Sequence, residues 1–95
     1  MAEPTTMATH SATLTAVSAV MVERQRQREK RGDPILSLAA QLAILVQEVG
    51  DVARVISEPW NSREPATLEI DRDVYRRELV QVAAVAVAAI EAVDW

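Results

Sequence analysis

The sequence predicts an all-α protein of three main helices that form a bundle completed by association of identical chains. Apolar residues recur at helical spacing along three long segments. Only two glycines and four prolines interrupt the 95 residues, so few turns are signalled. There is no Phe, and aromatic residues make up 3% of the chain, so the core consists of small aliphatic side chains. A domain of this size buries only about 60–65% of its unfolded surface, which favours oligomerisation.

The first helix is expected over residues 11–31, after a polar leader of residues 1–10 that we expect to be disordered. Residues 11–95 then form a single domain. Ser11 or Thr13 is the expected N-cap, and Gly32 ends the helix. One apolar stripe runs along this helix and consists of Leu14, Val17 and Met21. The only histidine, His10, falls in the leader and is expected to be an exposed tail residue.

The second helix is expected over residues 35–58. Its apolar residues alternate in steps of four and three, which predicts a seam for another helix. The seam consists of Leu38, Leu42, Leu45, Val49, Val52 and Ile56. Glu48 and Asp51 lie beside this seam in an otherwise apolar row. Gly50 costs about 1 kcal/mol relative to Ala inside a helix, so we expect a second helix or a ligand to approach it closely.

The third helix is expected over residues 72–93, with Asp71 or Asp73 as its N-cap. Residues 82–90 are all apolar, so this helix is expected to be central in the domain or in an oligomer. The connection before it, residues 59–71, is long for a helical hairpin.

Two pairs of polar residues suggest a metal site. Glu48 and Asp51 are three residues apart, as are Glu78 and Gln81, and residues at this spacing share one helical face. Packed side by side, the two helices can direct these four side chains into one volume. Oxygen ligands gathered in this way suit a hard cation such as Mg²⁺, with Mn²⁺ as an alternative.

Composition excludes several functions. The chain has no cysteine, so disulfides and thiolate metal sites are excluded. Its net charge of -4 argues against nucleic-acid binding by a general basic surface. The apolar run at residues 11–22 is too short to span a bilayer, so we expect no membrane association and a cytoplasmic location.

Residues 23–31 contain half of the ten basic residues of the chain. One interpretation is a solvated helix end, where cations face the negative end of the helix dipole. The alternative is a patch that binds the phosphates of an anionic ligand. Spacing alone favours the solvated end.

The motifs resemble those of the MazG-like proteins of the all-α nucleoside triphosphate pyrophosphohydrolase superfamily. That family carries E-E-x-x-E on one helix and E-x-x-D on the next, and the chain has Q-E-V-G-D at 47–51 and E-L-V-Q at 78–81. The stretch E-R-Q-R-Q-R-E-K-R-G at 23–32 is also similar to the E-R-x-R-Q-x-x-K-W-G segment of some members. Together these matches span most of residues 23–94.

The resemblance implies hydrolysis of a nucleoside triphosphate to a monophosphate and pyrophosphate by a Mg²⁺-dependent homodimer or homotetramer. By position, Glu48, Asp51 and Glu78 match the metal ligands, with Gln81 assisting, and Glu48 and Glu78 are the candidate catalytic residues. It also implies phosphate contacts near the end of the first helix. The candidates there are Gln27, Arg28 and Lys30.

The chain departs from the family motif at several positions. Gln47 and Gln81 are amides where the motif has acids, so Gln47 cannot act as a base. Asp51 is shorter than the usual Glu, and Arg31 replaces the motif Trp. Two alternatives therefore stay open. One is a weakened or inactive relative that binds a nucleotide or a protein, and the other is a structural oligomer whose acids pair with arginines such as Arg54, Arg76 or Arg77.

Overall fold

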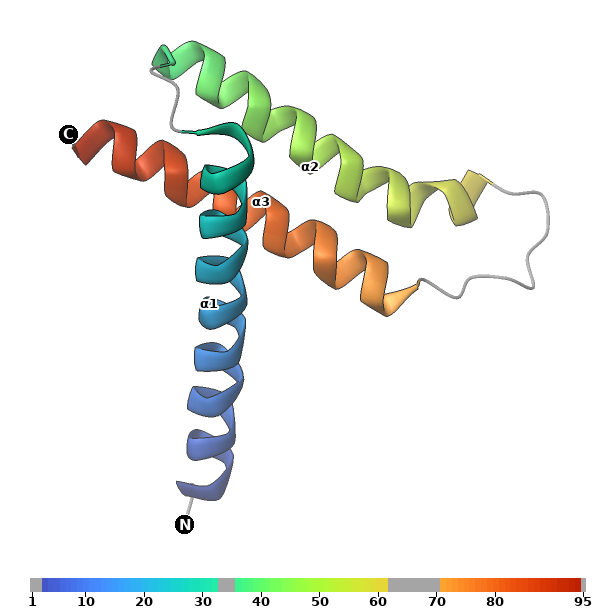
Figure 1. Cartoon of the computed structure of the whole chain (residues 1–95). Helices are drawn as coiled ribbons and strands as arrows, with labels where there is room; N and C mark the ends of the chain where they lie inside the picture. Colours follow the sequence, from blue (N-terminus) through green and yellow to red (C-terminus); the bar gives the residue numbers. More distant parts are fainter. Residues whose placement is uncertain (1–2, 33–35, 62–70, 95) are drawn as a thin grey trace.

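A computed structural model describes residues 3–32, 36–61 and 71–94, with the side chains of 3–6 and 56–61 outside the description. Within these ranges the chain forms helices and no strand (Figure 1). The helices are α1 (Glu3–Arg31), α2 (Leu38–Asn61) and α3 (Arg72–Asp94). The all-α prediction is therefore confirmed. Most of the expected connection at 59–71 lies outside the described residues, although α2 itself continues to Asn61 rather than ending near residue 58.

The third helix is central to the fold, as its uniform apolar character predicts. Helix α3 packs against both α1 and α2, whereas α1 and α2 make no close backbone approach to each other within the described chain. Helix α2 runs beside α3, and α1 crosses α3 near its own C-terminal half (Figure 1). Ala84 of α3 is fully buried, and Val52 of α2 is 8% exposed.

Helix α1 begins at Glu3 rather than near residue 11. Residues 3–10, assigned to a leader from the sequence, thus belong to its first turns. Two Thr hydroxyls of this segment bond within the helix itself. Thr13 Oγ1 donates to the Thr9 carbonyl at 3.0 Å and Thr15 Oγ1 to the Ser11 carbonyl at 2.9 Å, so these side chains bond the preceding turn. Neither Ser11 nor Thr13 is the N-cap.

The other helix boundaries follow local chemistry. Gly32 ends α1 as expected, with φ of 71° and its N–H bonded to the Arg28 carbonyl at 2.7 Å. Helix α2 begins later than expected because Ser37 caps it, and Ser37 Oγ accepts from the Ala40 N–H at 3.1 Å. Asp71 is the N-cap of α3, since its Oδ1 accepts from the N–H groups of Asp73 and Val74 at 3.1 and 3.2 Å.

Much apolar surface remains uncovered. The chain exposes 7631 Å². On each helix several large apolar side chains are exposed, and the most exposed on each are Val22, Met7, Leu14 and Met21 on α1, Leu38, Leu42 and Val46 on α2, and Ile90 and Val93 on α3. This is the surface expected of a chain that buries its core by association, but oligomerisation itself stays a prediction. No described helix is both long and apolar enough to cross a membrane.

Candidate functional site

The face of α2 that packs toward α3 is the row containing the acids. Ile44, Glu48, Asp51 and Val55 are all half-buried, and Val52 beside them is buried. The sequence pattern predicts that this row lies on the flank of a seam, and that prediction is wrong in part. The seam divides, because Leu45 and Val52 turn inward while its other described members stay exposed. Those exposed members are Leu38, Leu42 and Val49.

Glu48 is the most perturbed acid of this row. Burial raises the pKa of its carboxyl group, and the negative charges of Asp51 and, more weakly, of Glu78 and Glu23 raise it further. Arg31, at the end of α1, acts in the opposite direction. The fold therefore brings carboxylates from all three helices into electrostatic range of Glu48. Their combined charge favours a cation at this position.

Asp51 already has a partner. The Arg54 guanidinium, one turn further along α2, forms an ion pair with the Asp51 carboxylate. Asp51 is 31% exposed and Arg54 67%, so the pair lies at the rim of the interface between α2 and α3. This is the kind of pairing expected of a structural helical oligomer.

The four predicted metal ligands are only partly gathered. Glu48, Asp51, Glu78 and Gln81 are all half-buried and lie on the two helices that pack together. No three acidic or histidine side chains within the described ranges are grouped closely enough to hold a metal ion. The donor chemistry and the charge around Glu48 fit a hard cation, and binding one requires these side chains to converge. The metal site stays a prediction.

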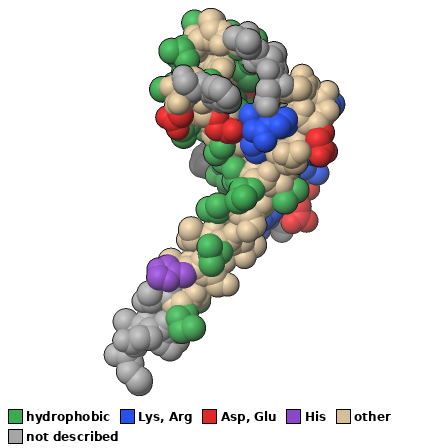
Figure 2. Space-filling model, turned by 60° about the vertical axis from the view of Figure 1, so that its left-hand side comes forward, with side chains coloured by type: hydrophobic (Ala, Val, Ile, Leu, Met, Phe, Trp, Pro, Cys, Tyr) green, Lys and Arg blue, Asp and Glu red, His purple; other side chains and the backbone are tan. Residues whose placement is uncertain are grey.

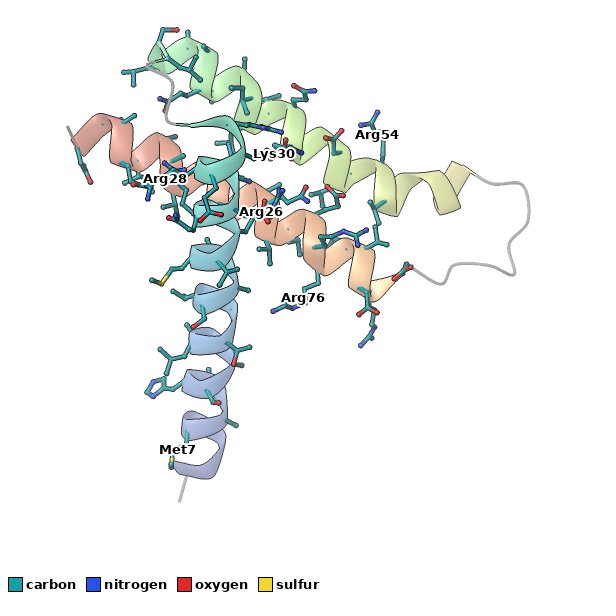
Figure 3. All side chains as sticks on the ribbon, viewed as in Figure 1. Met7, Arg26, Arg28, Lys30, Arg54 and Arg76 are labelled. Carbon is teal, nitrogen blue, oxygen red and sulfur yellow. The ribbon has the colours of Figure 1, made fainter. Side chains whose placement is uncertain are left out.

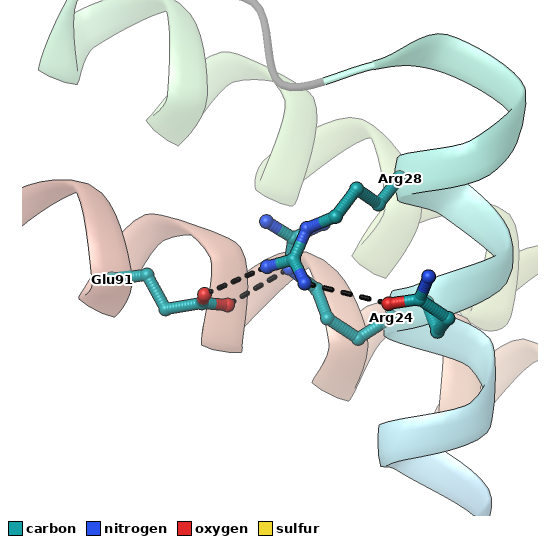
Figure 4. Close-up of polar contacts among 4 residues, drawn as sticks. Arg24, Arg28 and Glu91 are labelled. Atoms are coloured by element: carbon teal, nitrogen blue, oxygen red, sulfur yellow. Dashed lines mark hydrogen bonds and ion pairs between the residues drawn. The ribbon is translucent and has the colours of Figure 1, made fainter.

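The predicted phosphate-binding residues of α1 have other contacts. Arg28 Nη2 pairs with Glu91 Oε2 at 3.0 Å, and Arg24 Nε donates to Glu91 Oε1 at 2.9 Å (Figure 4). Gln27 Nε2 donates to Glu23 Oε2 at 3.0 Å. Lys30 is exposed near the α2 side of the helix end (Figure 3). Arg28 thus holds α1 against α3, and its role toward phosphate stays a prediction.

Sequence reasoning missed Glu91 and Glu23. Glu91 receives two arginines from α1, and only its position among apolar residues of α3 hints at a buried partner. Glu23 accepts two hydrogen bonds from Arg26, at 2.8 and 2.7 Å. These bonds hold the pKa of the Glu23 carboxyl group below its ordinary value, in opposition to burial.

A shallow groove of about 570 Å³ lies between α1 and the first half of α3. Its charged lining consists of Glu23, Asp73, Arg76 and Arg77. Figure 3 shows Arg76 extending from α3 on the side where α1 crosses. The groove shares Glu23 with the group of acids around Glu48, so the two features adjoin.

Gly50 has no close neighbour in the part of the chain that the structure describes, although the loss of helix stability caused by a glycine at this position predicts one. A Cβ atom built at this position would meet nothing within 4 Å among the described residues. The expectation of a helix approaching Gly50 within the chain is therefore wrong. Gly50 lies on the exposed side of α2, next to the exposed Val49.

Comparison of the chain with protein-family models, with curated proteins and with solved structures gave no match.

Proposed function

We propose that this chain is a Mg²⁺-dependent nucleoside triphosphate pyrophosphohydrolase of the MazG-like kind, active as a homo-oligomer in the cytoplasm. The observation that supports this most is the environment of Glu48. It is a half-buried carboxylate with a raised pKa, and the charges of Asp51 and Glu78 act on it. Perturbed acids of this kind cluster at functional sites. The proposal is also supported by the sequence, because the spacing of the acids and the basic end of α1 resemble the motifs of MazG-like proteins.

In this proposal Glu48, Asp51 and Glu78 hold Mg²⁺, and the Gln81 amide oxygen assists. The ion supplies charge neutralisation for the triphosphate. Glu48 and Glu78 are the residues on which activity depends most, because they come from the two packed helices. Asp51 can bind the cation only if the cation displaces Arg54 from the Asp51 carboxylate. Arg31 acts electrostatically on Glu48, which supports a role of the basic end of α1 in binding substrate phosphates, and Lys30 and Arg31 are both exposed there.

The test is pyrophosphate release from a panel of nucleoside triphosphates with Mg²⁺, with Mn²⁺ and with EDTA. Glu48→Gln removes the charge of the central carboxylate with little change of shape. Glu29→Gln is the matched control, because Glu29 is an exposed acid of α1 that accepts a hydrogen bond from Gln25 Nε2 at 3.2 Å. We expect metal-dependent release in the wild type and the control and at least a hundredfold loss in Glu48→Gln. Equal rates in all three proteins, or no release from folded wild type, would refute the proposal.

The Asp51–Arg54 ion pair favours a second candidate function, that of a structural or ligand-binding helical oligomer without catalysis. The amides Gln47 and Gln81 agree with it. Thermal unfolding with and without Mg²⁺ separates the candidates. A metal site raises the melting temperature of the wild type and not that of Glu48→Gln, because a ligand that binds only the folded state stabilises it. A structural oligomer shows no Mg²⁺ effect, and a binding protein shows the effect without turnover.

A further inference from the structure

The N-terminal half of α1 is an arm that projects from the rest of the chain. Figure 1 shows it extending well beyond the layer formed by α2 and α3. Every residue from 7 to 18 is exposed, so no other described part of the chain covers the arm. Isolated helices of this length are marginal in water, and five of the twelve residues 7–18 are Thr or Ser, which are weaker helix formers than the three Ala among them. The arm therefore needs a partner to stay helical.

The apolar residues of the arm form a narrow seam. We call Met7, Leu14, Val17 and Met21 the α1 stripe, and their exposed fractions are 70%, 68%, 49% and 67%. Their steps of seven, three and four place them at alternating coiled-coil positions. His10 occupies the equivalent position between Met7 and Leu14, and Figure 2 shows the histidine beside hydrophobic side chains along the arm. The stripe stays exposed even at Met21, where α1 passes α3.

Two observations identify the partner as a second copy of the chain. Residues 7–18 are all exposed, which leaves an uncovered helical surface for the roughly 800 Å² per partner that a stable dimer needs. Residues 4–22 contain no Asp, Glu, Lys or Arg, although the whole chain carries a net charge of -4. Two copies can therefore meet through their arms without repulsion between like charges.

We propose that the α1 stripe pairs with the α1 stripe of a second copy, in a two-fold helix pair centred on Leu14. Leu14 lies midway between Met7 and Met21, so it faces its own counterpart whether the two helices run parallel in register or antiparallel. This pairing does not depend on the proposed function, and its test does not use activity.

The test exploits the absence of cysteine from the chain, because a single introduced thiol can cross-link only to its own copy. Leu14→Cys is oxidised at low micromolar concentration and analysed by non-reducing electrophoresis. Ala12→Cys is the matched control, since Ala12 is exposed on the opposite face of the same helix. Leu42→Cys tests whether two copies meet instead through the exposed face of α2. We expect a disulfide-linked dimer for Leu14→Cys and little for the other two variants. Cross-linking of Leu14→Cys at or below the level of Ala12→Cys would overturn the proposal, as would preferential cross-linking of Leu42→Cys.

Sedimentation analysis measures self-association in variants that are expected to weaken it and in one that is expected to strengthen it. Leu14→Glu is expected to weaken self-association at least tenfold, while Ala12→Glu leaves it within twofold. His10→Leu is expected to strengthen it, because an apolar residue then completes the seam. Circular dichroism verifies that each variant remains helical at the concentration used. The pairing would be refuted if the wild-type protein were monomeric at all concentrations. It would also be refuted if Leu14→Glu associated as strongly as the wild type.

Discussion

Arg24 Nε lies 2.9 Å from Glu91 Oε1, although the two residues are 67 positions apart in the chain. The Arg24 side chain is only 13% exposed, whereas that of Glu91 is 41% exposed. Arg28 reaches the second oxygen of the same carboxylate at 3.0 Å. One acid of α3 therefore fixes two successive turns of α1. This link sets where the basic end of α1 lies relative to Glu48.

Replacing Glu91 tests how firmly α1 is held. Glu91→Gln keeps the shape but removes the charge that both arginines face, so we expect unfolding free energy to fall by about 1 kcal/mol. Urea denaturation measures this fall, and high salt should reduce it because the pair is partly exposed. Glu29→Gln, in an exposed acid, should change stability by less than half as much. Equal losses in the two variants would show that the Glu91 pair contributes nothing specific.

The raised pKa of Glu48 has a predictable effect on stability. A carboxyl group whose pKa is higher in the folded chain opposes folding when it is ionised, so its cost is full above the folded pKa. We expect Glu48→Gln to melt at a higher temperature than wild type at pH 7 in EDTA. The difference should vanish as the pH falls below about 4.3, the ordinary glutamate pKa. Thermal melts between pH 4 and pH 8 measure it, and a lower melting temperature for the variant at pH 7 would contradict the assignment.

The N-cap of α3 distinguishes two neighbouring aspartates. Asp71→Ala removes the acceptor for two backbone N–H groups, so we expect a loss of about 1 kcal/mol. Asp73→Ala loses only a favourable charge in the first turn and should cost about 0.3–0.5 kcal/mol. Chemical denaturation of both variants gives the comparison. A larger loss for Asp73→Ala would mean that the helix starts later than Asp71.

The two glycines should respond oppositely to alanine. Gly50→Ala is expected to stabilise the chain by about 0.5–1 kcal/mol, because its Cβ meets nothing within 4 Å. Gly32→Ala should destabilise it by about 1 kcal/mol, because φ at Gly32 is 71°. Melting temperatures at several protein concentrations provide the measurement. A loss of stability or of self-association in Gly50→Ala would show that a second copy approaches this position.

Periodicity and end signals were sufficient to predict three helices, the central position of α3 and the end of α1 at Gly32. They misplaced the start of α1 because Ser and Thr resemble caps in sequence, whereas here two Thr hydroxyls bond the preceding turn. They also misassigned which row of α2 faces α3. A leucine seam and an acidic row differ by a rotation about the helix axis, and only the partner surface decides between them.

For the candidate site, spacing alone placed Glu48, Asp51 and Glu78 on the two helices that pack together. Spacing does not predict contacts between residues that are far apart in the sequence. The pairing of Arg24 and Arg28 with Glu91 depends on where α1 crosses α3, which no local pattern encodes. The Asp51–Arg54 pair agrees with the structural alternative, which names Arg54 as a partner of the acids, and its spacing of three residues is a helical neighbour relation.

Because α3 is the only described helix that packs against both others, the order of synthesis constrains how the chain matures. The ribosome produces α1 and α2 first, and these two helices have no close backbone contact with each other. Neither can dock until residues 72–94 emerge. Tertiary folding therefore waits for the final quarter of the 95 residues, and until then nascent chains expose the apolar faces of both helices to chaperones.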